Sequence, residues 1–342
     1  MDRVILLGEG PTAASAFEAL AAQFEVCAVF RRLIDANDPV AESAARRSVP
    51  LIAQTTISRI DSEIRRLRPA CVVISSYDRL IPSELLEMTP FINVHYGPLP
   101  RYRGRANVNW AILNHESEAA ITIHTVEAGL DSGNILFQRL IPIGQNATVT
   151  ELYLELNNIQ GSELGRTVAR RLAGYAGEAQ QGPASYCCSR IPEDGEIDWT
   201  AAVRDVYALV RALAPPYPGA YTYFRLQKIV VLKAAPVLNA LEYVGRVPGR
   251  VCAINEEPGS VDVLTGDGVL RIYEVGNANG ARLEAAQLIR STKDTLGLAT
   301  HDLLRRIQVL EQELALLKHE RAPQDEAIPS GNELVHKWSS RD

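Results

Sequence analysis

The first hundred residues alternate short apolar runs with segments whose apolar residues recur at helical spacing. Val4–Leu7 is a continuous apolar run, as expected of a strand covered on both faces, and Thr12–Gln23 carries apolar residues on one helical face. The alternation continues to a strand predicted over Phe91–His95. Strands that alternate with helices are joined by right-handed crossovers, so the pattern predicts a doubly wound, mostly parallel α/β sheet.

The pattern changes after Ile121–Val126, which reads as a half-exposed strand, and after a long helix predicted over Val149–Leu172. Residues 174–196 are rich in Gly, Gln, Ser and Pro, which indicates a linker. Beyond it, a helix and short strands separated by turn residues predict a small, OB-like β-barrel. The predicted limits are 1–175 for the α/β domain, 176–200 for the linker, 201–298 for the barrel-like domain, 299–320 for a helix and 321–342 for a flexible tail.

Composition narrows the class of protein. The 342 residues are 46% hydrophobic, as in soluble globular proteins, which excludes collagen-like and disordered chains. The net charge of −6 offers no global positive field, so no nucleic acid is expected as a partner. The five cysteines lack C-x-x-C spacing, so no metal is expected. Val4–Leu7 is too short for a signal or membrane segment, which predicts a cytoplasmic protein without membrane contact.

A glycine-rich turn, Gly8 to Ala13, follows the first strand and opens the first helix. It matches G-x-G-x-x-A, the fingerprint of dinucleotide-binding folds. The second strand ends in Arg31 and Arg32 rather than in an acid that would bind a ribose, and two arginines suit only a 2′-phosphate. Two interpretations stay open: an NADP-dependent oxidoreductase, and a turn whose glycines serve packing alone.

Three side chains carry the chemistry of a second candidate site. Asn93 and His95 lie two residues apart at a strand end, so both point to one face at the edge where α/β sheets bind ligands. Asp131 lies in a loop bracketed by glycines. An amide donor, an imidazole and a carboxylate suit acyl or formyl transfer to an amine, which needs oxyanion stabilisation and proton movement. The alternative is that the first two cap a strand end and Asp131 is a turn residue.

The segment His301–His319 carries a heptad pattern. Its apolar residues are spaced 4, 3, 4 and 3 apart, with charged residues between them. They are Leu303, Ile307, Leu310, Leu314 and Leu317. Pairing in a homodimer and docking on the chain's own body both stay open.

Several ordered blocks of the sequence carry the motifs N-x-H, P-x-Y-R-G and G-x-D-x-G. The blocks are Ile92–Gly104, Asn109–Ile112, Ile121–His124, Gly129–Ile135, Ile191–Trp199 and Arg211–Ala220. Together they resemble the formyltransferases that use N10-formyltetrahydrofolate, with the last two similar to the opening of that family's C-terminal barrel. The resemblance covers about residues 1–295.

The resemblance implies an enzyme that transfers the formyl group of N10-formyltetrahydrofolate to a primary amine. Asn93, His95 and Asp131 match the family's catalytic triad, in which Asp131 would raise the pKa of a protonated His95 beside the oxyanion. His124 is interpreted as structural. The family's folate slot corresponds to two loops, and the residues implied to bind folate are Tyr77, Arg79, Leu80, Ile81, Glu127, Gly129 and Leu130.

The acceptor amine divides the family. Members that act on methionyl-tRNA carry a basic insertion after the second strand, where this chain has Asp35, Asn37 and Asp38. A small-molecule amine is therefore expected, either a nucleotide-linked amino sugar or an amino acid, free or carrier-bound. The residues expected to bind it are Tyr96, Gly97, Pro98, Arg101, Arg103 and Arg105, since arginines hold phosphate bidentately. Methionyl-tRNA, water and, more distantly, a non-catalytic scaffold role stay as alternatives.

Overall fold

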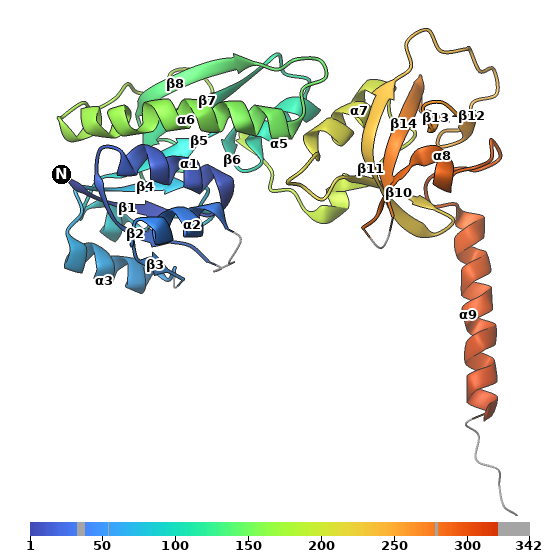
Figure 1. Cartoon of the computed structure of the whole chain (residues 1–342), viewed down its shortest axis with the longest axis horizontal. Helices are drawn as coiled ribbons and strands as arrows, with labels where there is room; N and C mark the ends of the chain where they lie inside the picture. The colour runs from blue at the N-terminus through green and yellow to red at the C-terminus, as the bar shows by residue number, and fades with distance from the viewer. Residues whose placement is uncertain (33–37, 54, 278–279, 321–342) are drawn as a thin grey trace, which may run out of the picture. The chain divides into compact units, whose positions relative to one another are not determined.

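The N-terminal half folds around a sheet of strand order β3-β2-β1-β4-β5-β7-β8 (Figure 1). The structure, a computed structural model, describes residues 1–32, 38–53, 55–277 and 280–320. The pairs from β3 to β5 are parallel, and β7 pairs antiparallel with β5 and β8, which confirms the predicted mostly parallel α/β sheet. The strands are β1 (Arg3–Leu7), β2 (Glu25–Phe30), β3 (Leu51–Ile52), β4 (Cys71–Ser75), β5 (Phe91–His95), β7 (Glu118–Thr125) and β8 (Ile135–Pro142).

Helices cover both faces of this sheet. Alternate residues of β1 enter different cores: Val4 packs in the core that contains Phe17 of α1, and Ile5 in the core that contains Ile60 of α3. That alternation explains why β1 is apolar at every position from Val4 to Leu7. The helices of this half are α1 (Gly10–Ala21), α2 (Pro39–Arg46), α3 (Ile57–Leu67), α4 (Ser83–Leu86), α5 (Asn107–Leu113) and α6 (Val149–Leu172).

The strand predicted as half-exposed is buried on both faces. Ile121 and Ile123 of β7 pack in the core that α6 covers, and neither is exposed. Thr122 and His124 point to the opposite face and are buried as well. That prediction was wrong because the polar residues of β7 face other buried polar groups rather than water.

The segment predicted as a linker is bound to the N-terminal half. Within it, the short strand β9 (Tyr186–Cys187) pairs in parallel with β6 (Arg103–Gly104), and a 3-10 turn follows over Pro192–Gly195. Helix α7 (Val203–Ala212) comes next and contributes residues to two cores, that of the N-terminal sheet and that of the C-terminal sheet.

The C-terminal sheet is separate and antiparallel throughout, in the order β10-β11-β14-β13-β12 with β15 beside β14. A second, β-rich region was predicted here and is confirmed. Its elements are β10 (Ala220–Phe224), β11 (Gln227–Pro236), β12 (Val251–Asn255), β13 (Ser260–Leu264), β14 (Val269–Gly276), β15 (Arg282–Glu284) and the short helix α8 (Ala285–Leu288). Residues 1–297 form one compact unit, and helix α9 (Thr300–Glu320) belongs to a second. The tail predicted over 321–342 lies outside the described residues.

Candidate active site

The end of β5 and the neighbouring strand β7 bring two polar side chains together. Asn93 pairs in register with His124. The Nδ2 of Asn93 lies 3.0 Å from Nε2 of His124, and Nδ1 of His124 lies 2.7 Å from the carbonyl oxygen of Thr125. A carbonyl only accepts, so Nδ1 carries the hydrogen of the neutral ring and Nε2 accepts from the amide of Asn93. His124, interpreted from the sequence as structural, therefore orients a predicted catalytic side chain.

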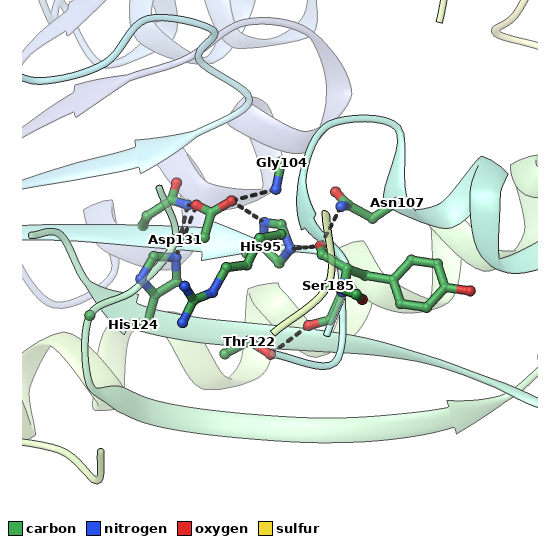
Figure 2. Close-up of polar contacts among 12 residues, drawn as sticks. His95, Gly104, Asn107, Thr122, His124, Asp131 and Ser185 are labelled. Atoms are coloured by element: carbon green, nitrogen blue, oxygen red, sulfur yellow. Dashed lines mark hydrogen bonds and ion pairs between the residues drawn. The ribbon is translucent and has the colours of Figure 1, made fainter. Parts of the chain in front are cut away.

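His95 is buried, and its ring is held through Nε2. This nitrogen donates to the carbonyl oxygen of Tyr102 at 2.8 Å. The same oxygen also accepts from Nδ2 of Asn107 at 2.6 Å. Gly97 lies against the same nitrogen, because a Cβ at this position would come within 2.7 Å of Nε2. The basic nitrogen of neutral His95 is thus Nδ1, which lies 3.6 Å from Oδ2 of Asp131 (Figure 2).

Asp131 adopts a left-handed backbone conformation, with φ of 48°, that directs its carboxylate between the two histidines. Its Oδ2 accepts the Gly104 N–H at 2.8 Å, and its Oδ1 accepts an N–H of Asn93 at 3.4 Å. Burial by itself raises the pKa of Asp131. The Gly104 N–H, together with the histidine rings when they are protonated, outweighs that effect and lowers the pKa of Asp131, so the carboxylate stays ionised.

The pKa of His95 lies below its ordinary value. Burial lowers it most, the charge of Asp131 raises it, and the neighbouring His124 lowers it further. The expectation that Asp131 leaves His95 protonated is therefore corrected: Asp131 does act in the expected direction, but desolvation of the ring is the larger effect. The resting ring is neutral and able to accept a proton.

A cavity of about 390 Å³ lies beside this cluster. Asn93, His95 and Asp131 all line it. So do the residues that the resemblance implies for folate, namely Tyr77, Arg79, Leu80, Ile81, Glu127, Gly129 and Leu130. Loops far apart in the chain thus meet around one space, and its walls are the two loops of the implied folate slot.

The residues expected to bind the acceptor do not all reach this cavity. Tyr96 and Arg105 line it. Arg101 instead pairs with Glu116 at 2.5 Å, and Arg103 donates to Oε1 of Gln180 at 2.7 Å. Gly97 and Pro98 are also absent from the described lining of the cavity. Gly97 instead lies against the ring of His95. Of the three arginines expected to bind the acceptor, Arg105 lines the cavity, while the guanidinium groups of Arg101 and Arg103 are bound to Glu116 and Gln180.

Three tyrosines that come from separate parts of the chain form one wall of the cavity. Tyr96 follows β5, Tyr153 lies on α6, and Tyr217 follows α7. Neighbouring rings are tilted against each other with centroids 5.7 Å and 6.3 Å apart, and the hydroxyls of Tyr153 and Tyr217 lie 3.0 Å from each other. Tyr153 and Tyr217 were not predicted, because nothing in the sequence pairs α6 with the segment after α7.

The glycine turn holds a carboxylate of the protein itself. Asp38 accepts the Gly10 N–H at 3.3 Å, at the helix N-terminus where a dinucleotide would place its pyrophosphate. The same carboxylate forms a buried ion pair with Arg31 at 2.6 Å, and Arg32 pairs with Glu9. A Cβ at Gly8 would lie 1.9 Å from the carbonyl oxygen of Ser75. These contacts favour the packing interpretation of the turn over NADP binding.

The acidic loop expected in place of a basic insertion is only partly described. Asp35 and Asn37 lie outside the described residues. Asp38 is described, and besides its pair with Arg31 it accepts the Val40 N–H at 2.8 Å and so caps α2. The charge of Asp38 is therefore neutralised inside the fold.

Two further features concern the described part of the chain only. None of its helices combines the length and apolar character that crossing a membrane requires. Within the same ranges, no group of three or more His, Cys, Asp or Glu side chains is placed to hold a metal ion.

Comparisons with known proteins agree with this geometry. The model of the family described as formyl transferase matches residues 25–168, and that of the formyl transferase C-terminal domain matches residues 191–293. A methionyl-tRNA formyltransferase of Geobacter sulfurreducens is 31% identical over 257 residues, which cover 73% of this chain and 78% of that protein.

Solved structures share the fold at low sequence identity. An N-formyltransferase from Helicobacter canadensis, solved with folinic acid and dTDP-3-aminofucose, has a TM-score of 0.60 and 19% identity over 80% of this chain and 98% of its own. HypX from Aquifex aeolicus in complex with tetrahydrofolic acid has a TM-score of 0.60 and 17% identity over 85% of this chain and 47% of its own. With both family models matched in order and a relative at 31% identity, the chain belongs to the formyltransferase family, the N-formyltransferases that take their formyl group from N10-formyltetrahydrofolate.

Proposed function

We propose that this enzyme transfers the formyl group of N10-formyltetrahydrofolate to the primary amine of a small molecule, with Asn93, His95 and Asp131 as its catalytic residues. The observation that carries the proposal is their convergence on one cavity whose walls are the two implied folate loops. The amide of Asn93 lies 3.4 Å from one oxygen of the Asp131 carboxylate, and Nδ1 of His95 lies 3.6 Å from the other. That arrangement supplies the donor, base and counter-charge that formyl transfer requires.

The chemistry follows from the protonation states. The acceptor nitrogen attacks the formyl carbon, and the carbonyl electron pair moves to oxygen, where an N–H of Asn93 stabilises the developing charge. The contact of that N–H with Asp131 is long, at 3.4 Å, so it can turn to the new oxyanion. Nδ1 of neutral His95 takes the proton of the attacking amine, and Asp131 stabilises the imidazolium. When the tetrahedral intermediate collapses, His95 returns the proton to N10 of the leaving tetrahydrofolate.

A small acceptor fits the charge of the site better than a tRNA does. A tRNA needs several cations that face phosphates, and each contact adds to the salt dependence of binding. Arg105 and Arg79 line the cavity, and Glu9, Asp78 and Glu127 line it as well. The wall of Tyr96, Tyr153 and Tyr217 offers flat rings and hydroxyl groups to a compact ligand such as a nucleotide-linked amino sugar or an aminoacyl group.

Methionyl-tRNA is the second candidate acceptor, and the 31% identity to a methionyl-tRNA formyltransferase favours it. The deciding experiment incubates the enzyme and N10-formyltetrahydrofolate with nucleotide-linked amino sugars, amino acids and methionyl-tRNA, read by mass spectrometry. We expect a formyl adduct on a small amine, and excess methionyl-tRNA should leave its rate unchanged. Formylation of methionyl-tRNA at physiological salt without activity on any small amine would replace our proposal with the second candidate. Formate release without an adduct would indicate water as the acceptor.

The proposal includes a homodimer held by α9. The heptad residues of α9 are 41–53% exposed, with Ile307 and Leu314 at position a and Leu303, Leu310 and Leu317 at position d. A β-branched residue at position a followed by leucine at position d, as in Ile307 and Leu310, favours two parallel strands. In that arrangement Arg306, at position g, lies opposite Glu311, at position e, of the second copy.

Charge exchange tests this pairing. Arg306→Glu should weaken the dimer about ten-fold, because it places like charges opposite each other on both sides of the seam. The double variant Arg306→Glu/Glu311→Arg should restore the dimer, and Arg305→Glu, at the outward position f, should leave it unchanged. Light scattering gives the mass of each. A wild-type monomer, or a chain cut after residue 300 that stays dimeric, would rule out α9 as the dimer contact.

A further inference from the structure

A side chain from the predicted linker reaches the loop that carries Asp131. The Nε2 of Gln180 donates to the carbonyl oxygens of Asp131 at 2.7 Å and of Gly133 at 2.9 Å. Its Oε1 accepts from the guanidinium of Arg103 at 2.7 Å. All the hydrogens of the amide nitrogen are therefore used on one loop, and the oxygen is used on another.

The same segment also holds the loop that supports His95. The hydroxyl of Ser185 accepts the N–H of Tyr102 at 2.9 Å, and the carbonyl of Ser185 accepts the N–H of Arg103 at 2.8 Å. The carbonyl of Tyr102 is the acceptor for His95, and the next residue but one, Gly104, donates to the Asp131 carboxylate. The two catalytic loops thus share one neighbour, the segment from 180 to 185.

The backbone conformation of Asp131 depends on contacts from the segment 180–185. A left-handed φ is uncommon for a residue with a side chain, and it persists only where surrounding contacts hold it. The bonds from Gln180 satisfy the carbonyl of Asp131 itself and of Gly133, two residues on. Without these donors the loop loses the contacts that keep the carboxylate between Gly104 and His95.

We propose that Gln180 is a positioning residue of the transfer reaction: it holds the backbone at Asp131 so that the carboxylate faces Nδ1 of His95. The inference rests on the proposed function of this site. Gln180 does not touch the reacting atoms, so its effect is on the placement of the carboxylate and hence on the rate of the chemical step.

The test replaces Gln180 by Met, which keeps the length of the side chain and removes every hydrogen bond. A misplaced catalytic group costs about 10- to 100-fold in rate, so kcat should fall by that factor while KM for N10-formyltetrahydrofolate stays within about two-fold. As Asp131 moves away from His95, its charge raises the His95 pKa less, so the acid limb of the kcat profile should move to lower pH. Gln181→Met is the matched control, because Gln181 is exposed and its side chain donates only to the nearby Ala179 carbonyl.

A second variant separates placement from folding. Gln180→Glu keeps an acceptor for Arg103 and loses both donors, so it should show the same loss of kcat. Unchanged kcat in Gln180→Met, an equal loss in Gln181→Met, or failure of both Gln180 variants to fold would each overturn the inference. Absence of formyl transfer by the wild-type enzyme would instead count against the proposed function.

Discussion

Asn93 donates an amide hydrogen to Nε2 of His124 at 3.0 Å, and this contact sets which way the amide faces. The ring of His124 has no freedom to exchange roles, because its Nδ1 hydrogen is held by the carbonyl of Thr125. The nitrogen end of the Asn93 amide is therefore directed along the sheet toward Asp131 rather than away from it. The contact with His124 thus holds the amide while its other N–H, in the long contact with Asp131, turns to the oxyanion.

Replacing His124 tests that role. His124→Ala frees the Asn93 amide to rotate, so we expect kcat to fall about ten-fold with little change in folate binding. The double variant Asn93→Ala/His124→Ala should be no slower than Asn93→Ala alone, because His124 acts through Asn93. Additive losses in steady-state kinetics would show that His124 has a separate function.

Removal of either proton-handling group should abolish turnover and leave folate binding intact. His95→Ala and Asp131→Ala each remove a group from the proton path, and such losses cost about 10²- to 10⁴-fold in rate. The control is His115→Ala, since His115 is bound to Asp205 and does not line the cavity. Single-turnover rates and tetrahydrofolate titration measure the two properties; turnover near that of the wild type would refute the assignment.

The pH profile follows from the lowered pKa of His95. In the proposed mechanism the neutral ring is the base, so activity is present above its pKa and is lost as pH falls through it. Because burial lowers this pKa below 6.5, the acid limb of kcat should lie below pH 6.5. Asp131→Asn removes the charge that raises the pKa, so it should move the limb to still lower pH. An acid limb above pH 6.5 would contradict a neutral resting His95.

Arg31 should contribute to stability and not to nucleotide binding. Only 4% of the Arg31 side chain is exposed, and Arg31→Ala leaves the Asp38 carboxylate buried without its partner. Loss of one member of a buried pair costs about 3–5 kcal/mol of unfolding free energy. Urea unfolding measures that loss, and adding NADPH to the wild type should leave the cofactor fluorescence unchanged. A stable variant, or NADPH binding that depends on Arg31, would favour the oxidoreductase interpretation.

The fold was predictable wherever local patterns carry it. The strand Phe91–His95 and the helix Val149–Leu172 occur at the predicted residues, because burial on both faces and helical periodicity are visible in a short stretch of sequence. β8 was not predicted: its residues alternate between buried and exposed only in part, and Gln138 and Arg139 interrupt the apolar pattern. It is a strand because β7 pairs with it along most of its length.

The candidate site shows the same division. The three residues of the predicted triad could be proposed because their types and motif spacing are local. His124 was missed because its place opposite Asn93 depends on the register between β5 and β7, which no local pattern reveals. Arg101 and Arg103 were expected at the cavity because they lie close to His95 in the sequence. Their hydrogen-bond acceptors, Glu116 and Gln180, are distant in the sequence, so no local pattern predicts these contacts.

Helix α7 has a consequence for how this chain unfolds and recombines. Ala208 and Ala212 pack in the core of the N-terminal sheet, while Val206 and Val210 pack in that of the C-terminal sheet. Melting either core removes one side of the helix and uncovers the other, so residues 1–297 should denature in a single cooperative transition. For the same reason, a chimera that exchanges C-terminal halves between relatives inherits a mismatched helix wherever the crossover point falls within or before α7. A crossover after α7 instead mismatches Val206 and Val210 with the new C-terminal core, so an exchange requires the helix residues that face the exchanged core to be changed with it.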